Sequence, residues 1–247
     1  MSACSSNDNY LEQNAEMATN TVKPRSALPL CTNCSNPKEL KTYFDSINYI
    51  KMSKSDKLII RDINEGLFQA DDRDLKKEVF FKSTYPLAYQ VNKEIKLEKR
   101  DLAKNRNIAQ LMKKYKVDNV ADLKVRLGTI PVSIIMAQAA IESAYGTSRF
   151  AEEGNALFGQ WTTNPNGMTP REKPDSKWKV ARFATPLDSA RSYALNINTN
   201  STYREFRKLR SEGKDPIDGL GKYSQKGDEY MKILSSIIDN NNLINYK

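Results

Sequence analysis

One carboxylate stands alone in the most apolar stretch of the sequence. Residues 130–150 read IPVSIIMAQAAIESAYGTSRF, and from Ile130 to Ser148 the only side chain expected to be charged at pH 7 is that of Glu142. A helix formed here would bury most of its surface, and Glu142 with it. Apolar surroundings raise the pKa of a carboxyl group toward neutrality, which suits a general acid. The alternative is a structural ion pair, for example with Arg149, and the spacing alone leaves both open.

The flanking residues predict a helix that begins near Pro131 and ends at Gly146. Proline is favoured in the first turn of a helix, and glycine is favoured just beyond its end. At helical spacing Glu142 shares one face with Gln138, Tyr145 and residues such as Ala139. This face is therefore expected to leave room for a ligand beside the carboxylate.

The composition excludes several other kinds of active site. The sequence has no histidine, so Ser-His-Asp and Cys-His catalysis are not available to it. Its three cysteines do not by themselves complete a four-ligand zinc site, and no loop is dense enough in acids to suggest calcium. We therefore expect neither a metal nor another cofactor.

The charge balance favours an anionic partner. Lysine and arginine total 39 against 30 aspartate and glutamate, a net charge of +9. Nucleic acid, anionic lipid and the acidic polymers of a bacterial wall all meet this requirement. The basic residues alternate with acidic ones, as in KEIKLEKRDLAKNRN, which indicates a solvated helix face, so we do not expect nucleic acid. No run of eighteen apolar residues predicts a membrane span.

Residues 1–37 are rich in Ser, Asn, Thr and Pro and predict a flexible polar leader. Small residues precede Cys4, as at a lipoprotein processing site, so Cys4 is a candidate lipid anchor; an incidental thiol explains the same three residues equally well. Cys31 and Cys34 in CTNC are interpreted as a structural pair or idle thiols and not as a redox site.

The rest of the chain, residues 38–247, is expected to form a single helical domain. Its N-terminal part, 38–127, has helical apolar periods, including one long amphipathic helix over 86–117. Its catalytic part, 128–247, contains the Glu142 helix and then a Gly- and Pro-rich segment that predicts a β-hairpin with KWKVARF as the returning strand. Further helices follow, the first beginning at Thr185 and Pro186.

Three ordered segments carry a specific resemblance. AQAAIESAYGTSRFAEEGNALFGQW, ARFATPLDSARSYALNIN and GLGKYSQKGDEYMKIL resemble glycoside hydrolase family 73, the glucosaminidase domain of bacterial wall hydrolases. The upstream FFKSTYPLAYQVNKEI resembles the Bax-type branch of that family. The similarity extends over roughly residues 75–240. It implies a mostly α, lysozyme-like helical domain with a small β-hairpin at the cleft.

The resemblance also implies roles for individual residues. Glu142 matches the glutamate that protonates the glycosidic oxygen. Tyr223 would orient the substrate or steady developing charge, and the second carboxylate would be Glu172 or Asp175 of the hairpin, unless the acetamido group of the substrate takes that role. The residues expected to line the cleft are Gln138, Tyr145, Asn155, Phe158, Gly159 and Trp161; core packing is the stronger interpretation for Phe158, and sugar contact for Trp161.

The expected function is that of an endo-β-N-acetylglucosaminidase that cuts peptidoglycan between N-acetylglucosamine and N-acetylmuramic acid. Such an enzyme would work as a monomer in the bacterial envelope, in the periplasm or as an outer-membrane lipoprotein. A lytic transglycosylase is the first alternative, because it also depends on one glutamate. A non-catalytic wall-binding module is the second, although such a module has no use for a desolvated acid.

Overall fold

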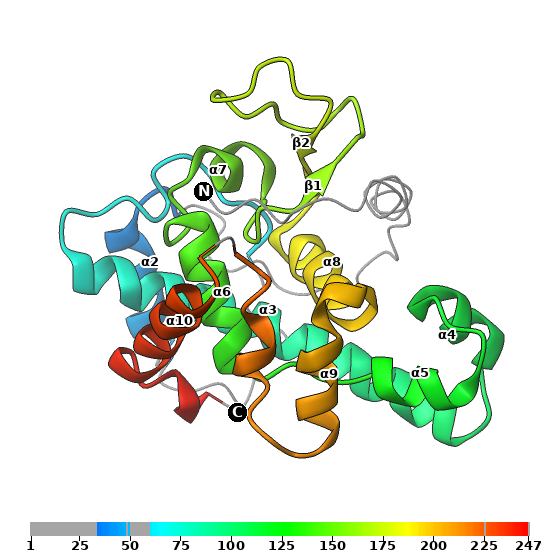
Figure 1. Ribbon diagram of the computed structural model, residues 1–247. Helices are drawn as coiled ribbons and strands as arrows, with labels where there is room; N and C mark the ends of the chain where they lie inside the picture. Colours follow the sequence, from blue (N-terminus) through cyan, green and yellow to red (C-terminus); the bar gives the residue numbers. More distant parts are fainter. Residues whose placement is uncertain (1–33, 48, 50–59, 225, 247) are drawn as a thin grey trace. The chain divides into compact units, whose positions relative to one another are not determined.

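The computed structural model describes residues 34–47, 49, 60–224 and 226–246. These residues are mostly helical, and their only strands pair into one short antiparallel hairpin (Figure 1). This confirms the predicted fold class, and the predominance of helices with one hairpin agrees with a lysozyme-like fold. None of the described helices is long and apolar enough to cross a membrane.

The described elements follow one another along the chain in a fixed order, which Figure 1 labels. They are α2 (Pro37–Ser46), α3 (Arg73–Ala103), α4 (Ile108–Tyr115), α5 (Val120–Arg126), α6 (Val132–Ser143), α7 (Arg149–Gly154), β1 (Trp161–Thr162), β2 (Lys179–Val180), α8 (Pro186–Thr199), η3 (Ser201–Tyr203), α9 (Arg204–Ser211), η4 (Ile217–Leu220), α10 (Asp228–Asn240) and η5 (Leu243–Asn245).

The chain forms two compact units. Among the described residues, one unit takes 91–137 and 193–246, and the other takes those before residue 91 together with 138–192. The boundaries fall inside α3, α6 and α8, so each unit is built from separate stretches of sequence. The predicted division at residues 127 and 128 does not coincide with these units, and it stays a prediction.

The long amphipathic helix is interrupted where the sequence predicted continuity. The helix α3 ends at Ala103, and α4 begins only at Ile108. Between them Asn105 and Asn107 adopt left-handed conformations, with φ of 53° and 55°, which asparagine tolerates better than most residues. The carboxylate of Asp101 accepts hydrogen bonds from the side chains of both Arg106 and Asn107 and so stabilises the break.

The N-terminal half of α3 contains Pro86 yet remains helical. Proline has no N–H to donate to the carbonyl of Lys82, four residues earlier. The hydroxyl of Tyr49 donates to that carbonyl at 2.9 Å and replaces the missing bond. The ring of Tyr49 in turn stacks on Phe44 of α2, with ring centroids 4.9 Å apart. The hydrogen bond that keeps α3 helical at Pro86 is therefore linked to the packing of α2.

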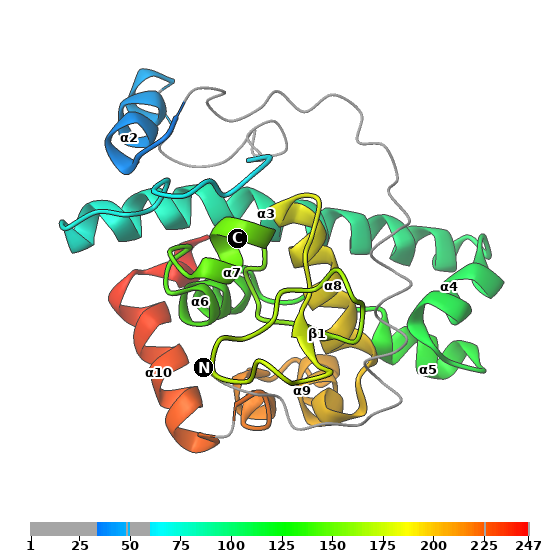
Figure 2. The same ribbon diagram turned by 90° about the horizontal axis from the view of Figure 1, so that it is seen from above.

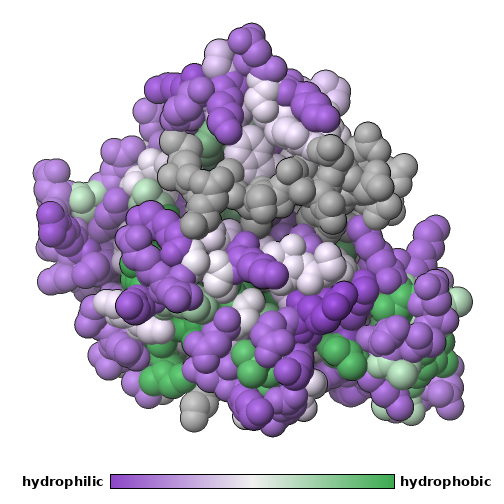
Figure 3. Space-filling view, viewed as in Figure 1, coloured by the Kyte–Doolittle hydropathy of each residue, from purple (hydrophilic) through white to green (hydrophobic). Residues whose placement is uncertain are grey.

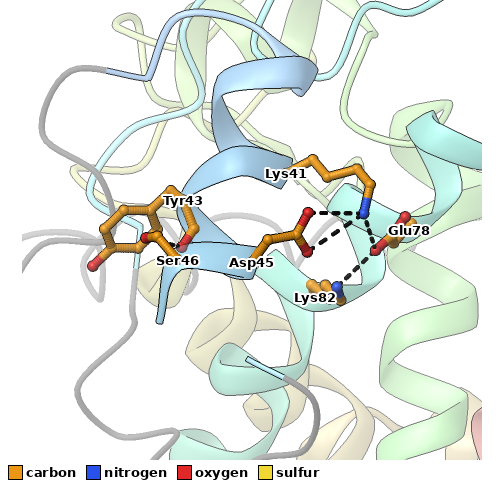
Figure 4. A network of polar contacts seen from close by, with 6 residues as sticks. All are labelled: Lys41, Tyr43, Asp45, Ser46, Glu78 and Lys82. Atoms are coloured by element: carbon orange, nitrogen blue, oxygen red, sulfur yellow. Dashed lines mark hydrogen bonds and ion pairs between the residues drawn. The ribbon is translucent and has the colours of Figure 1, made fainter. Parts of the chain in front are cut away.

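Charged side chains also join α2 to α3 (Figure 4). The ammonium of Lys41 lies 3.1 Å from a carboxylate oxygen of Asp45 and 3.4 Å from one of Glu78. Lys82, one turn along α3, approaches the same Glu78 oxygen to 2.6 Å. Beneath this network α2 buries Leu40 and Phe44, so apolar burial and paired charge act together at this contact.

Within the other unit, α4 packs beside α5, and α5 contacts α9 (Figures 1 and 2). The guanidinium of Arg210 on α9 donates to the carbonyls of Gly128 and Val125 and to the amide oxygen of Asn198. A side chain at Gly128 would overlap this guanidinium. Arg210 thus satisfies carbonyls left free where α5 ends. Apolar surface remains over α4 and α5 in Figure 3, where α5 exposes Val120 and Val125.

The hairpin is short, and its base is fixed to α7. Its strands pair Trp161 with Val180 and Thr162 with Lys179 (Figure 1), and in the loop between them the carbonyl of Thr169 accepts from the guanidinium of Arg149 on α7 at 2.7 Å. Buried Ala156, Met168 and Val180 form a small apolar cluster under it. The returning segment KWKVARF contributes only two residues to the strand, fewer than the sequence predicted.

Candidate active site

The predicted carboxylate lies at the last turn of α6. The helix begins at Val132, directly after Pro131, and ends at Ser143, three residues before Gly146. Glu142 is half-buried, whereas the sequence predicted that the helix would bury it fully. The difference arises because the helix ends one residue after Glu142. The side chain of Glu142 can therefore extend beyond the apolar surface that the rest of the helix buries. A half-buried carboxylate combines protein walls on one side with access on the other, as a general acid requires.

An unusual turn follows Glu142. Ala144, Tyr145 and Gly146 have φ of 52°, 58° and 78°, so three successive residues are left-handed. The hydroxyl of Ser143 is fully buried, donates to the carbonyl of Ala139 at 2.6 Å and accepts from the amide of Gly146 at 2.8 Å. Left-handed non-glycine residues are costly and cluster at functional sites. Ser143 therefore stabilises the backbone of the turn that follows the candidate acid.

The segment NALFGQW approaches Glu142 through a glycine. Gly159 has φ of 59°, and a Cβ placed on it would lie 4.0 Å from a carboxylate oxygen of Glu142. The segment is attached to α8 on both sides of this point: the Ser189 hydroxyl accepts from the amide of Leu157 at 3.1 Å, and the amide of Gln160 donates to the Ser192 hydroxyl at 2.8 Å. The structure thus brings Glu142 and Gly159 together.

Gln138 precedes Glu142 in the sequence and Tyr145 follows it. The two side chains lie in different surroundings. Gln138 is fully buried in α6. Tyr145 has left the helix, and its half-buried ring makes edge contacts with Phe80 and Phe81, at centroid distances of 5.6 and 5.8 Å. Burial raises the pKa of the Tyr145 hydroxyl. The helical face that the sequence predicted from Gln138 to Tyr145 therefore ends at Ser143.

Besides Gln138, two more of the predicted cleft residues are buried. Phe158 is only 3% exposed, which agrees with the core packing that the sequence favoured for it. Asn155 is 8% exposed, and its amide is engaged within the chain. Its oxygen accepts from the amide of Ile63 at 2.8 Å, and its nitrogen donates to Asp62 at 3.1 Å and to the carbonyl of Phe183 at 3.3 Å. The amide predicted to contact sugar thus binds two backbone groups and the carboxylate of Asp62.

The hairpin carries the two candidate second carboxylates and both tryptophans. Glu172 and Asp175 are exposed on the loop between the strands, and neither side chain makes an ion pair or hydrogen bond in the described part of the chain. Trp161 in β1 is half-buried, and so is Trp178, which the sequence did not single out as a site residue. Lys177 lies over the ring of Trp178 at 5.2 Å.

Tyr223 belongs to the other compact unit, among four tyrosines. Its ring stacks on Tyr230 at 5.6 Å and lies 5.8 Å from Tyr203 and 6.4 Å from Tyr193. It is 5% exposed. Its role toward substrate remains a prediction.

The sequence is also similar to known proteins. The family model for glucosaminidases, described as mannosyl-glycoprotein endo-beta-N-acetylglucosaminidase, matches residues 117–243. The chain belongs to this family. A curated relative, Protein bax of Escherichia coli (strain K12), is 27% identical over 194 residues, which cover 67% of this chain and 70% of the relative. No solved structure matches the chain.

Membership of the glucosaminidase family makes the chain a glycoside hydrolase in kind and confirms the predicted resemblance. The family match includes Glu142 and Gly159 but begins at residue 117. Phe80, Phe81 and two of the residues bound to Asn155, Asp62 and Ile63, lie before it. Sequence reasoning missed this contribution because contacts such as that of Ile63 with Asn155, 92 residues apart, leave no periodic signal in the sequence.

Proposed function

We propose that this glucosaminidase-family protein is a peptidoglycan hydrolase that cleaves the β-1,4 bond between N-acetylglucosamine and N-acetylmuramic acid as an endo-β-N-acetylglucosaminidase. One observation carries the proposal: the carboxylate of Glu142 faces Gly159 of the NALFGQW segment in a chain of this family. In this role Glu142 donates a proton to the glycosidic oxygen as the bond breaks. Because Gly159 has no side chain, the sugar can approach the segment's backbone beside that acid.

The second carboxylate is proposed to come from the hairpin. Glu172 and Asp175 are exposed and make no side-chain ion pair in the described residues, so either can turn toward a bound glycan. Glu172→Gln should lower turnover by about two orders of magnitude or more and leave binding of wall fragments nearly unchanged, because the lost interaction acts in the transition state. Activity within about threefold of wild type would assign the role to Asp175 or to the substrate's acetamido oxygen.

The reaction is tested by its products. Purified wall is digested, the new ends are reduced, and the fragments are identified by mass spectrometry. Reduced N-acetylglucosamine is the expected product. Anhydro-muramyl ends would instead identify a lytic transglycosylase, and the absence of any released fragment would identify a wall-binding module.

The role of Glu142 is tested by Glu142→Gln. The amide has nearly the same shape, but its N–H protons are far too weakly acidic to be transferred to the glycosidic oxygen, so cleavage should fall by at least about a thousandfold. The melting temperature should change by less than about 2 °C, because substitutions that preserve shape at a half-exposed position are usually nearly neutral. Glu205→Gln, which changes an exposed acid on α9, is the matched control and should keep full activity. An active but strongly destabilised Glu142→Gln would show a structural ion pair instead.

We further propose that the protein works in the bacterial envelope as a monomer, anchored by a lipid on Cys4. Cys4 and Cys31 lie outside the described residues, but Cys34 is disulfide-bonded, which supports an oxidising compartment. Diacylation of one cysteine binds a membrane far more strongly than a basic surface does. Fractionation of cells that express wild type or Cys4→Ser tests the anchor: the mutant should be released from the membrane, and equal solubility of the two would contradict it.

A further inference from the structure

The chain segment 60–69 contacts both stretches that flank Glu142. At one end, a Cβ on Gly146 would overlap the ring of Phe68, so Phe68 packs directly on the left-handed turn after the acid. At the other end, the amide of Ile63 and the carboxylate of Asp62 bind the side chain of Asn155. Asn155 stands four residues before Gly159, the residue that faces the acid.

A third attachment lies between these two. The Glu152 carboxylate on α7 accepts from the amide nitrogen of Gln69 at 2.9 Å and from the backbone amide of Gly66 at 3.4 Å. Gly66 has φ of 84°, a conformation that glycine adopts without strain. The segment is therefore bonded to α7 along its length.

The same turn is held from α3. Phe80 makes edge contacts with both Phe68 and Tyr145, at centroid distances of 5.4 and 5.6 Å. Lys76 donates to the hydroxyl of Thr147 at 3.1 Å. Phe68, Lys76 and Phe80 all precede the region matched by the family model. The turn after Glu142 is thus enclosed by residues that the family match does not contain.

We propose that segment 60–69 positions the catalytic acid: through Phe68 on one side and Asn155 on the other, it fixes the separation between the turn that follows Glu142 and the segment that carries Gly159. The five residue-to-residue steps from Ile63 to Phe68 span at most about 18 Å, so the link is short and a shift at one end displaces the other. Asn155 and Asp62 are positioning residues in this arrangement. They contact the frame of the site and not the glycan.

The test measures position before activity. Asn155→Gly removes the side-chain amide, while glycine keeps the φ of 53° that Asn155 adopts at the end of α7. Amide hydrogen exchange should become faster at Ile63, which loses its acceptor, and also at Gly146 and Ser148 in the turn beyond Phe68. Faster exchange confined to Ile63 would overturn the proposal.

The control is Asn64→Ala, because the exposed side chain of Asn64 makes no hydrogen bond in the described residues. It should change neither exchange at the turn nor activity. This exchange measurement needs no substrate, so it decides the proposal even if wild-type protein fails to release N-acetylglucosamine ends and the proposed function falls.

Activity supplies the second measurement and depends on the proposed function. On soluble glycan strands Asn155→Gly should lower kcat by about tenfold to a hundredfold, with KM within about threefold, since misplaced catalytic groups slow the chemical step more than binding. An unchanged kcat would overturn the proposal.

Asp62 allows a finer test because it is exposed, so its variants should fold. Asp62→Ala removes one of the two acceptors of the Asn155 amide nitrogen and should lower kcat, whereas Asp62→Asn keeps a side-chain oxygen there and should restore it. If Asp62→Asn is as slow as Asp62→Ala, the charge and not the position matters, and the positioning role is wrong.

Discussion

Ser143 shows how one hydroxyl can fix the backbone beside the proposed catalytic acid. It lies next to Glu142, is fully buried, and bonds both to the helix before it and to the turn after it. The turn contains two left-handed residues other than glycine, Ala144 and Tyr145, each of which costs about 1–2 kcal/mol. Bonds such as those of Ser143 are what allow the surrounding structure to retain that strain.

Ser143→Ala should therefore destabilise the protein by about 1–3 kcal/mol, because the buried amide of Gly146 loses its acceptor. The free energy of unfolding from urea titration measures this. Ser211→Ala is the control, since the Ser211 hydroxyl bonds a carbonyl at the exposed end of α9, and it should cost less than about 0.5 kcal/mol. Equal costs for the two variants would show that the turn does not depend on Ser143.

For single residues, the sequence predicted which side chain could act as the acid better than it predicted which groups surround each site residue. The isolation of Glu142 among apolar residues indicated the candidate acid, because charge is rare in such stretches. The same reasoning did not reveal that the amide of Asn155 binds Ile63, since its partner is 92 residues away. The sequence alone does not distinguish a polar loop residue that binds substrate from one that binds the backbone, because the distinction depends on which residues lie near it.

The elements of the fold illustrate a similar limit. The cap at Thr185 and Asp188 that begins α8 is local, and it forms as predicted, with the two residues exchanging hydrogen bonds. The end of α3 is not predicted, because the apolar period continues in phase across Asn105. The continuity of α3 through Pro86 is not predicted either, because it depends on the hydroxyl of Tyr49, which is distant in the sequence.

The contact between α2 and α3 should weaken in acid. Burial raises the pKa of Glu78, but hydrogen bonding and charge from Lys82 and then Lys41 outweigh it, so the pKa is lowered from 4.5. A lowered carboxylate pKa gives stability that is present above the ordinary value and lost as the pH falls through the folded-state value. Glu78 is partly exposed, so this stability is about 0.5–1 kcal/mol.

Unfolding free energies of wild type and Glu78→Gln measure this effect across pH. Wild type should be the more stable at pH 6, and the difference should disappear near pH 3. Asp71→Asn, at an exposed acid before α3, is the control and should show no such convergence. A difference that stays constant with pH would mean that Glu78 contributes packing and not charge.

At the scale of the whole molecule, the compact units, the family match and the predicted domain division follow different boundaries. Each unit contains chain from both sides of residue 117, where the family match begins. Sequence reasoning divides a chain into consecutive stretches, whereas these units are assembled from separated ones. The prediction of a single catalytic domain therefore says little about which residues fold together.

The net charge of +9 belongs to the whole molecule, and it predicts salt-dependent binding to the wall. Anionic wall polymers attract a basic protein over about 10 Å at 0.1 M salt but only about 3 Å at 1 M. The Glu142→Gln protein should therefore leave purified wall as the salt rises, while cleavage by wild type of short N-acetylglucosamine–N-acetylmuramic acid chains, made neutral by reduction of their carboxyl groups, should change by less than about twofold. Cosedimentation and product release measure the two effects.

A variant of the same protein separates charge from sugar contact. Lys104, Lys113 and Lys124 are exposed and make no ion pair in the described residues, so replacing all three by glutamine lowers the net charge from +9 to +6 without removing an ion pair. In the Glu142→Gln background this variant should leave the wall at lower salt, whereas in the wild-type background it should cut short neutral chains at an unchanged rate. If both proteins stay on the wall at high salt, the glycan is held by uncharged contacts in the cleft, and the basic surface has no part in locating the substrate.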